Sequence, residues 1–128
     1  MLTLNPVGRL MRNRFGGVAE EFALVATPLI LLLLGTMEVG RGLWMQNALN
    51  YSVEEAARCA SIDVNNCSTS AQIKSFAAGR SGAGFTSATF TPSTAACGNL
   101  VSASYPMTLH IPFASMSITL TAQSCYPK

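Results

Sequence analysis

Side chains that serve as general acids and bases are scarce in this chain. His110 is the only histidine, and beyond residue 40 only Glu54, Glu55 and Asp63 carry a carboxylate. A serine or cysteine nucleophile needs a positioned base partner, and no spacing in the sequence suggests one. We therefore expect that the chain is not an enzyme.

The sequence also lacks the usual motifs that hold metals and nucleotides. Its four cysteines form no C-x-x-C pair, and a single histidine adds little to a zinc site. The glycine-rich segment 80–84 (RSGAG) lacks the lysine and the spacing of a phosphate-binding loop. We expect no cofactor and no bound metal.

Basic residues are few, and three of the eight come early in the chain as Arg9, Arg12 and Arg14. The whole chain has a net charge of +2, but without residues 1–16 it keeps five basic and six acidic residues, for a net charge of −1. The basic isoelectric point therefore belongs to the leading segment, and we expect no nucleic-acid partner.

The sixteen residues from Phe22 to Met37 (FALVATPLILLLLGTM) contain no charge. As a helix they rise about 24 Å, against roughly 30 Å for a bilayer core, and Val18, Ala19 and Val39 can lengthen the span. A secretory signal peptide is one alternative, but no A-x-A-like site follows the run. A soluble core helix is another, but the run is apolar on every face and the chain is short. We expect a membrane-inserted helix.

The early arginines set the expected orientation, because no acidic residue lies among them and basic flanks stay in the cytoplasm. The part of the chain beyond about residue 40 then lies outside, where disulfides can form. All four cysteines fall in that part: Cys59, Cys67, Cys97 and Cys125.

Residues 12–25 (RNRFGGVAEEFALV) resemble the processing site of type IV prepilins, and specifically that of the TadE-like pseudopilins of tight-adherence (Flp) pilus systems. In that family a prepilin peptidase cuts after a glycine, leaving four residues, then a glutamate, then an aromatic residue. A cut after Gly16 would leave four residues that start at Gly17, followed by Glu21 and Phe22.

Two adjacent glutamates stand at the head of the apolar run. Glu20 departs from the family pattern, which usually has a small or aliphatic residue there, whereas the spacing from Gly16 favours Glu21 as the assembly residue. The resemblance implies that cleavage creates an α-amine on Gly17, which a neighbouring subunit's glutamate neutralises in a filament. Breaking such a buried pair is costly because it leaves an uncompensated charge. Apart from the resemblance, both glutamates fit first-turn positions that interact with the helix dipole.

Two further stretches resemble the same family. Residues 31–44 (LLLLGTMEVGRGLW) resemble the stretch in which an apolar run closes with glutamate, glycine and arginine, and residues 55–61 (EAARCAS) resemble its helix continuation. The resemblance implies four partners: the inner membrane, a prepilin peptidase, other pilins and the pilus assembly machinery. It also implies a single-pass protein of the bacterial inner membrane, with a cytoplasmic N-terminus and a periplasmic or extracellular head that can enter a pilus.

Beyond the apolar run, a stripe of apolar residues at helical spacing predicts that the helix continues as an amphipathic rod to about residue 61. A separate helix after a break at Gly40 or Gly42 is the alternative. The stripe consists of Trp44, Met45, Ala48, Leu49, Val53, Ala56, Ala57 and Ala60.

The rest of the chain predicts a small α+β head. Thr69 to Gln72 read as a capping box that opens a short helix, which Gly79 stops. Pro106 and Pro112 are expected at edges or turns of an antiparallel sheet that packs on the long helix. The expected strands are 86–90, 100–105, 107–111 and 117–123.

Four cysteines allow three disulfide connectivities. We favour Cys59 with Cys67, which would tie the helix end to the following turn, and Cys97 with Cys125, which would tie the loop before a strand to the C-terminus. Local pairing is the only reason for this choice.

The apolar run predicts a membrane anchor, and the resemblance implies a minor pilin or pseudopilin that a prepilin peptidase processes and that takes part in assembly of an adhesive tight-adherence pilus. Gly16, Gly17, Glu21 and Phe22 are the expected processing and assembly site. The alternative is an uncleaved, signal-anchored binding or adhesin domain that never enters a filament. The expected divisions are a leader (1–16), a transmembrane and amphipathic helix (17–61) and an extracytoplasmic head (62–128).

Overall fold

The computed structural model describes residues 16–63, 65–111 and 113–128. Residues 1–15 of the expected leader, with their three arginines, and Pro112 lie outside the described residues. The elements in chain order are α2 (Gly16–Ile62), α3 (Ser70–Arg80), the 3₁₀ turn η1 (Ser87–Thr89), β1 (Phe90–Ala95), β2 (Gly98–Ile111) and β3 (Ala114–Tyr126).

Helix α2 is a single helix of 47 residues that runs through Pro28 without interruption. It also runs through Gly40 and Gly42, so the alternative of a separate outer helix is wrong. Proline removes one backbone hydrogen bond, but the turns on both sides are rich in leucine and alanine, which favour the helix. The predicted continuous rod is confirmed.

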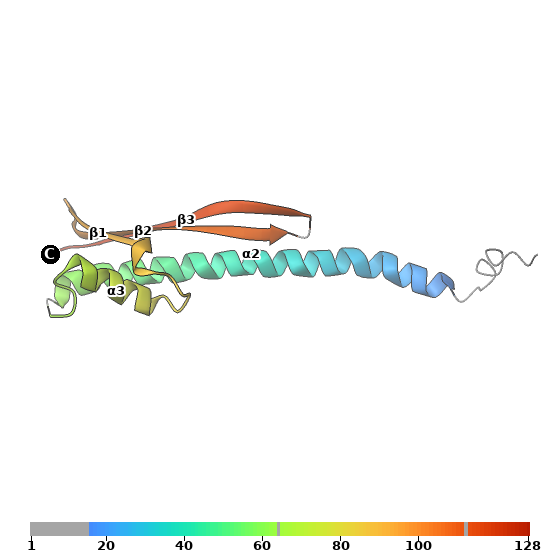
Figure 1. Cartoon of the computed structure of the whole chain (residues 1–128), viewed down its shortest axis with the longest axis horizontal. Helices are drawn as coiled ribbons and strands as arrows, with labels where there is room; N and C mark the ends of the chain where they lie inside the picture. Colours follow the sequence, from blue (N-terminus) through green and yellow to red (C-terminus); the bar gives the residue numbers. More distant parts are fainter. Residues whose placement is uncertain (1–15, 64, 112) are drawn as a thin grey trace, which may run out of the picture.

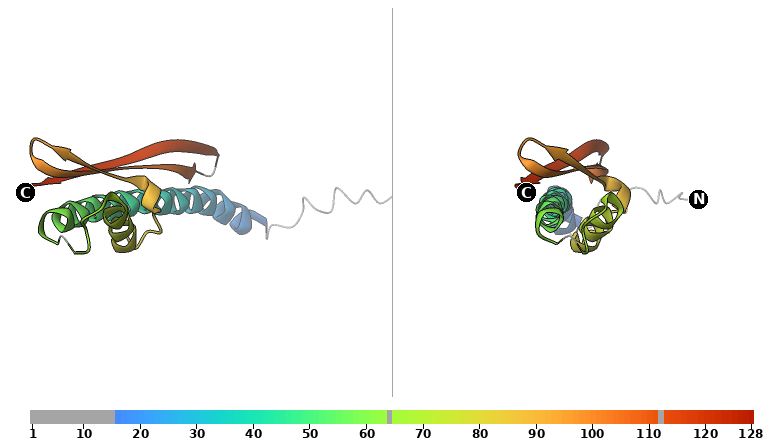
Figure 2. Two further views of the ribbon diagram at one scale, coloured as in Figure 1. Left: turned by 60° about the vertical axis from the view of Figure 1, so that its left-hand side comes forward. Right: turned by 90° about the vertical axis from the view of Figure 1, so that its left-hand side faces the viewer.

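The head has two layers. The three strands form one antiparallel sheet in the order β1-β2-β3, and α2 and α3 lie side by side on one face of it (Figures 1 and 2). The sheet covers only the outer half of α2, so the other half extends from the head as a bare rod (Figure 1). This is the predicted α+β architecture.

The core lies between α2, α3 and the inner face of the sheet. Leu49, Val53, Phe90 and Val101 are its largest apolar side chains that are fully buried. The predicted apolar stripe of α2 faces this core except at one position, because Trp44 is 56% exposed. Leu120 and Ala122, which alternate with polar residues along the last strand, are buried on the inner face.

Helix α3 begins with the predicted capping box. The Thr69 side chain accepts a hydrogen bond from the backbone of Gln72, and the Gln72 side chain accepts one from the backbone of Thr69. The helix does not stop at Gly79 as predicted, because it continues through Arg80 to a C-cap at Ser81. Ser81 keeps helical dihedral angles, so the helix ends without a glycine cap.

The predicted strands need three corrections. Residues 87–89 form the 3₁₀ turn η1, so β1 starts at Phe90 and runs to Ala95. The expected second and third strands are one strand, β2, that passes through Pro106. The last strand is longer than predicted, from Ala114 to Tyr126.

Pro106 is tolerated inside β2 because, among the described residues, the strand has only one partner at that point. Strand β1 pairs with β2 from Gly98 to Ala103, whereas β3 pairs with it as far as Ile111. Beyond Ala103 the outer side of β2 is therefore an open edge, where a residue without an N–H group costs no ladder bond. Pro106 does lie at an edge, but it does not end the strand.

Candidate processing and assembly site

The four predicted site residues lie in succession at the start of α2. Gly16 is the first residue of the helix, and a Cβ placed on Gly17 would have no heavy atom within 4 Å. Phe22 is 73% exposed. Gly17 and Glu21 are four positions apart and therefore share one helix face.

The two glutamates lie in the second turn of α2, not in the first. The interaction of a carboxylate with the helix dipole fades within the first turn, so the first-turn interpretation fails for the chain as it stands. Glu20 and Glu21 are both exposed.

The rest of this half of α2 is an uncovered apolar surface. Its best 18-residue window has a mean hydropathy of 2.1, and none of that window is buried within the protein. Burying a Leu or Val side chain contributes about 1.5 to 3 kcal/mol relative to leaving it exposed, so covering this surface would be strongly favourable. The helix is long and apolar enough to cross a membrane. Its most exposed members are Val18, Phe22, Leu24, Val25, Leu32 and Met37.

The apolar half of α2 ends at an ion pair that also holds the sheet. The Arg41 guanidinium donates to Glu38 Oε2 at 2.9 Å and to the backbone carbonyl of Thr108 at 2.8 Å. The backbone N–H of His110 donates to the same Glu38 oxygen at 3.4 Å. The pair therefore attaches the end of β2 to the helix. We name these contacts of Glu38 and Arg41 the clamp.

Sequence reasoning missed this role. Glu38 and Arg41 were noted only as part of the family resemblance, although a glutamate three residues before an arginine on a helix is a common ion-pair spacing. That spacing predicts the pair itself. The contact with β2 joins residues 67 positions apart, for which the sequence offers no signal.

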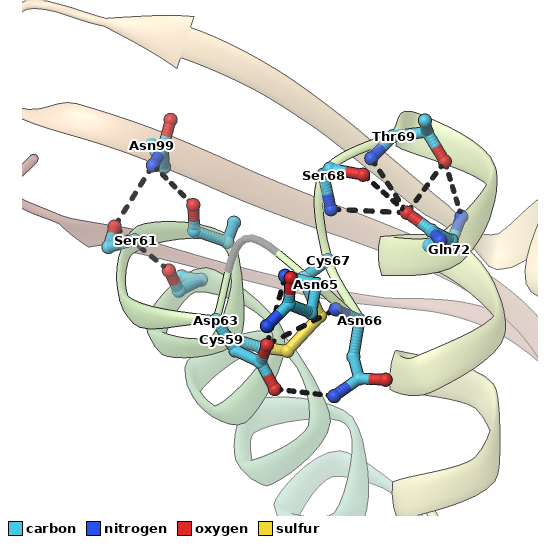
Figure 3. The surroundings of a disulfide bond; sticks show 12 residues. Cys59, Ser61, Asp63, Asn65, Asn66, Cys67, Ser68, Thr69, Gln72 and Asn99 are labelled. Carbon is cyan, nitrogen blue, oxygen red and sulfur yellow. Dashed lines mark hydrogen bonds between the residues drawn. A yellow bond between two sulfur atoms is a disulfide. The ribbon is translucent and has the colours of Figure 1, made fainter.

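The far end of α2 is fastened by a disulfide and a tight turn. Cys59 in the last turns of α2 is bonded to Cys67, with the Cα atoms 5.8 Å apart. Between them, the Asp63 carboxylate accepts hydrogen bonds from the backbone of Asn65 and Asn66 at 3.1 Å and from the Asn66 side chain at 2.7 Å (Figure 3). These bonds hold the pKa of the Asp63 carboxyl below its usual value, with the Asn66 side-chain amide as the main cause.

The second disulfide joins the β1–β2 turn to the last strand. Cys97 is bonded to Cys125, with the Cα atoms 6.2 Å apart. Beside it, the Asn99 amide donates to the carbonyl of Ala60 and to the Ser61 hydroxyl, both at 3.0 Å (Figure 3). The sheet is thus fixed to both the end and the middle of α2. Both disulfides are those favoured from local pairing.

Among the described residues, no group of three or more His, Cys, Asp or Glu side chains comes close enough to hold a metal ion. His110 instead lies at the end of β2, where its backbone contacts the clamp. The features that stand out are the glycine pair, the two glutamates and the bare apolar surface, all on α2. Together they can supply an exposed carboxylate and a hydrophobic contact surface.

Comparison with known proteins identifies this same helix. The family described as TadE-like protein matches residues 16–58, which is nearly all of α2 and none of the sheet. Curated proteins and solved structures gave no match. The match begins at Gly16, which is the first residue of α2 and the residue just before the expected mature chain. The chain is therefore TadE-like over residues 16–58, and this match associates it with tight-adherence pilus systems and with the membrane.

Proposed function

We propose that this chain is a minor pilin or pseudopilin, cut after Gly16 by a prepilin peptidase, that takes part in assembling an adhesive tight-adherence pilus. Its role is structural and not catalytic. The observation that carries the proposal is the bare apolar half of α2, which starts at the glycine pair and falls within the TadE-like segment. Monomeric proteins in water rarely expose an apolar surface of this extent, and such surfaces typically mark a contact with a membrane or with another protein.

Before assembly, the bilayer covers this surface, and in the filament the helices of neighbouring subunits take its place. The basic residues before α2 keep the N-terminus in the cytoplasm of a bacterial cell, so the head lies in the periplasm or beyond it. The protein is anchored in the inner membrane by one span.

Cleavage after Gly16 would change the positions of Glu20 and Glu21 relative to the start of the helix, and the two glutamates would then have different roles. Once residues 1–16 are removed, the helix starts at Gly17 and Glu20 enters its first turn, where a carboxylate interacts with the free N–H groups. Glu21 lies one residue further and on another face, because successive helical residues are about 100° apart. Glu21 is then the carboxylate that stays available for the α-amine of a neighbouring subunit.

The first experiment measures the N-terminus of the protein. The full chain is expressed in cells with and without a prepilin peptidase, and its intact mass and N-terminal sequence are determined after free thiols are alkylated. We expect a start at Gly17 that depends on the peptidase, and no cleavage of the Gly16→Leu variant. A chain that still starts at Met1 or Leu2 beside an active peptidase would instead be the uncleaved, signal-anchored binding domain.

A matched pair of variants separates processing from assembly. Glu21→Ala should be cut and anchored as the parent chain is, but should be lost from sheared pili, because the new α-amine has no partner. Glu20→Ala removes the carboxylate next to Glu21, and this variant should assemble normally. If both variants assemble equally well, Glu21 has no assembly role.

A further inference from the structure

The end of the β2–β3 hairpin carries apolar side chains that the head does not cover. Ile111 is 46% exposed, Phe113 is 87% exposed and Met116 is 50% exposed. Strands β2 and β3 pair through Ile111 and Ala114 at this end, so all three side chains lie within a short distance of the turn. We name Ile111, Phe113 and Met116 the hairpin tip.

The structure holds the hairpin tip beside the apolar half of α2. The hairpin runs along α2 and ends near the middle of the helix (Figure 1). The clamp attaches Thr108 and His110 to the helix at Arg41 and Glu38. On the side of the clamp towards Gly16, Leu34 and Met37 share a concavity of about 330 Å³ with Ile111, which Glu38 and His110 also line.

The surface of α2 at the same level is also apolar and uncovered. Leu33 is 54% exposed, Leu34 is 47% exposed and Met37 is 73% exposed. All three belong to the uncharged run from Phe22 to Met37. The hairpin tip therefore lies beside the end of the uncharged run that is nearer the head. There it widens the apolar surface of α2 that would face lipid.

Charge does not oppose contact with lipid. The chain has no Lys, Arg, Asp or Glu between Arg80 and Lys128, so the whole sheet lacks them. The nearest charged groups are those of the clamp, and the Arg41 side chain is 44% exposed. An arginine beside an apolar span is typically found at the level of the lipid headgroups.

We propose that the hairpin tip is a second membrane contact, seated in the lipid surface from which α2 emerges. The proposal rests on the proposed insertion of α2, because the helix fixes the height of the tip. Continuity with the lipid-facing side of α2 favours a lipid surface over a second copy of the chain as the partner.

Backbone hydrogen bonding limits how deep the tip can go. Within the part of the chain that the structure describes, the outer side of β2 beyond Ala103 has no partner strand, since its pairing with β1 ends there. An open strand edge is excluded from the hydrocarbon core, where its N–H and C=O groups find no water. The tip therefore lies at the boundary between headgroups and acyl chains, and it fixes the head at one tilt on the membrane.

Fluorescence of a single tryptophan tests this contact in the full chain. Trp44 is the only tryptophan, so a Trp44→Phe background allows one new reporter at a time. Phe113→Trp reports on the tip, Leu33→Trp on the span and Ser93→Trp on an exposed site of β1. Each variant is reconstituted in phosphatidylcholine vesicles whose acyl chains carry bromine either near the headgroup or near the methyl end.

We expect a blue-shifted emission from the Phe113→Trp reporter and quenching several-fold stronger than at position 93, greatest with bromine near the headgroup. Quenching at position 33 but not at 113 would overturn the proposal and leave the membrane anchor intact. Quenching at neither position would overturn both. A blue shift at 113 that grows with protein concentration, without lipid quenching, would overturn it in favour of a second copy.

Discussion

Gly98 closes the β1–β2 turn with a φ of 126°, a backbone conformation that side-chain-bearing residues rarely adopt. A Cβ at this position would clash with the carbonyl oxygen of Tyr126 and would lie 2.7 Å from Cα of Pro127. The C-terminal segment beside the turn is held by the neighbouring disulfide of Cys97, so it cannot move away freely.

Substitution of Gly98 should therefore be among the costliest changes in the head. We expect Gly98→Ala to lower the free energy of unfolding by about 3 kcal/mol, the upper end for a strained backbone position. Gly82→Ala is the matched control, because Gly82 also has a positive φ of 59° but would meet no atom within 4 Å. Its cost should be about 1 to 2 kcal/mol. Urea unfolding of the detergent-solubilised chain measures both, and equal losses would contradict the predicted clash.

Asp63 should make the stability of the head depend on pH in the acidic range. Its carboxyl pKa is lowered in the folded chain, mainly by the Asn66 side chain. A lowered folded pKa stabilises the fold at pH values above the unfolded pKa of 3.8, and this contribution is lost as the pH falls through the folded value. The stability difference between the parent chain and Asp63→Asn should thus be constant near neutral pH and shrink below about pH 4.

Unfolding curves of both proteins from pH 7 to pH 2, together with an NMR titration of the Asp63 carboxyl, measure this effect. Glu54→Gln is a suitable control, because Glu54 is exposed on α2, the helix that precedes this turn. An Asp63 midpoint at or above 3.8 would disprove the predicted direction.

At the scale of elements, the helices were more predictable than the strands. The periodic stripe around Leu49 and the capping box at Thr69 are local signals, and both match the structure closely. Pro106 misled the strand prediction because its tolerance depends on where β1 stops pairing, which is a property of the whole sheet. The clamp between Arg41 and Thr108 was missed for the same reason, since it joins distant parts of the chain.

The two disulfides should contribute unequally, because they close loops of different length. Cys59 and Cys67 are 8 positions apart, whereas Cys97 and Cys125 are 28 positions apart. Loop-closure entropy gives about 2.5 kcal/mol for the short loop and about 3.6 kcal/mol for the long one. The double variant Cys97→Ala/Cys125→Ala should therefore unfold at lower urea than Cys59→Ala/Cys67→Ala. The reverse order would mean that strain or residual structure outweighs chain entropy.

The head and the apolar half of α2 should be stabilised in different ways. The outer head is small, and small domains often depend on disulfides because they bury too little apolar surface. Its two disulfides and the clamp fix the sheet to α2. The apolar half of α2 makes no such contacts within the described residues, so we expect that damage to one half leaves the other intact.

Charged substitutions in the apolar run test that division. Leu29 and Leu33 are both more than half exposed, so neither contributes to the head's core. An arginine near the middle of a span costs about 2.5 to 3.5 kcal/mol, or roughly 5 to 7 kcal/mol for two. Leu29→Arg/Leu33→Arg should therefore be released from membranes by alkaline carbonate, whereas Leu29→Ala/Leu33→Ala should stay bound. Both should show no free thiol after expression in an oxidising compartment, because the head still folds. Carbonate-resistant membrane binding of the double arginine variant would show that α2 is not the anchor.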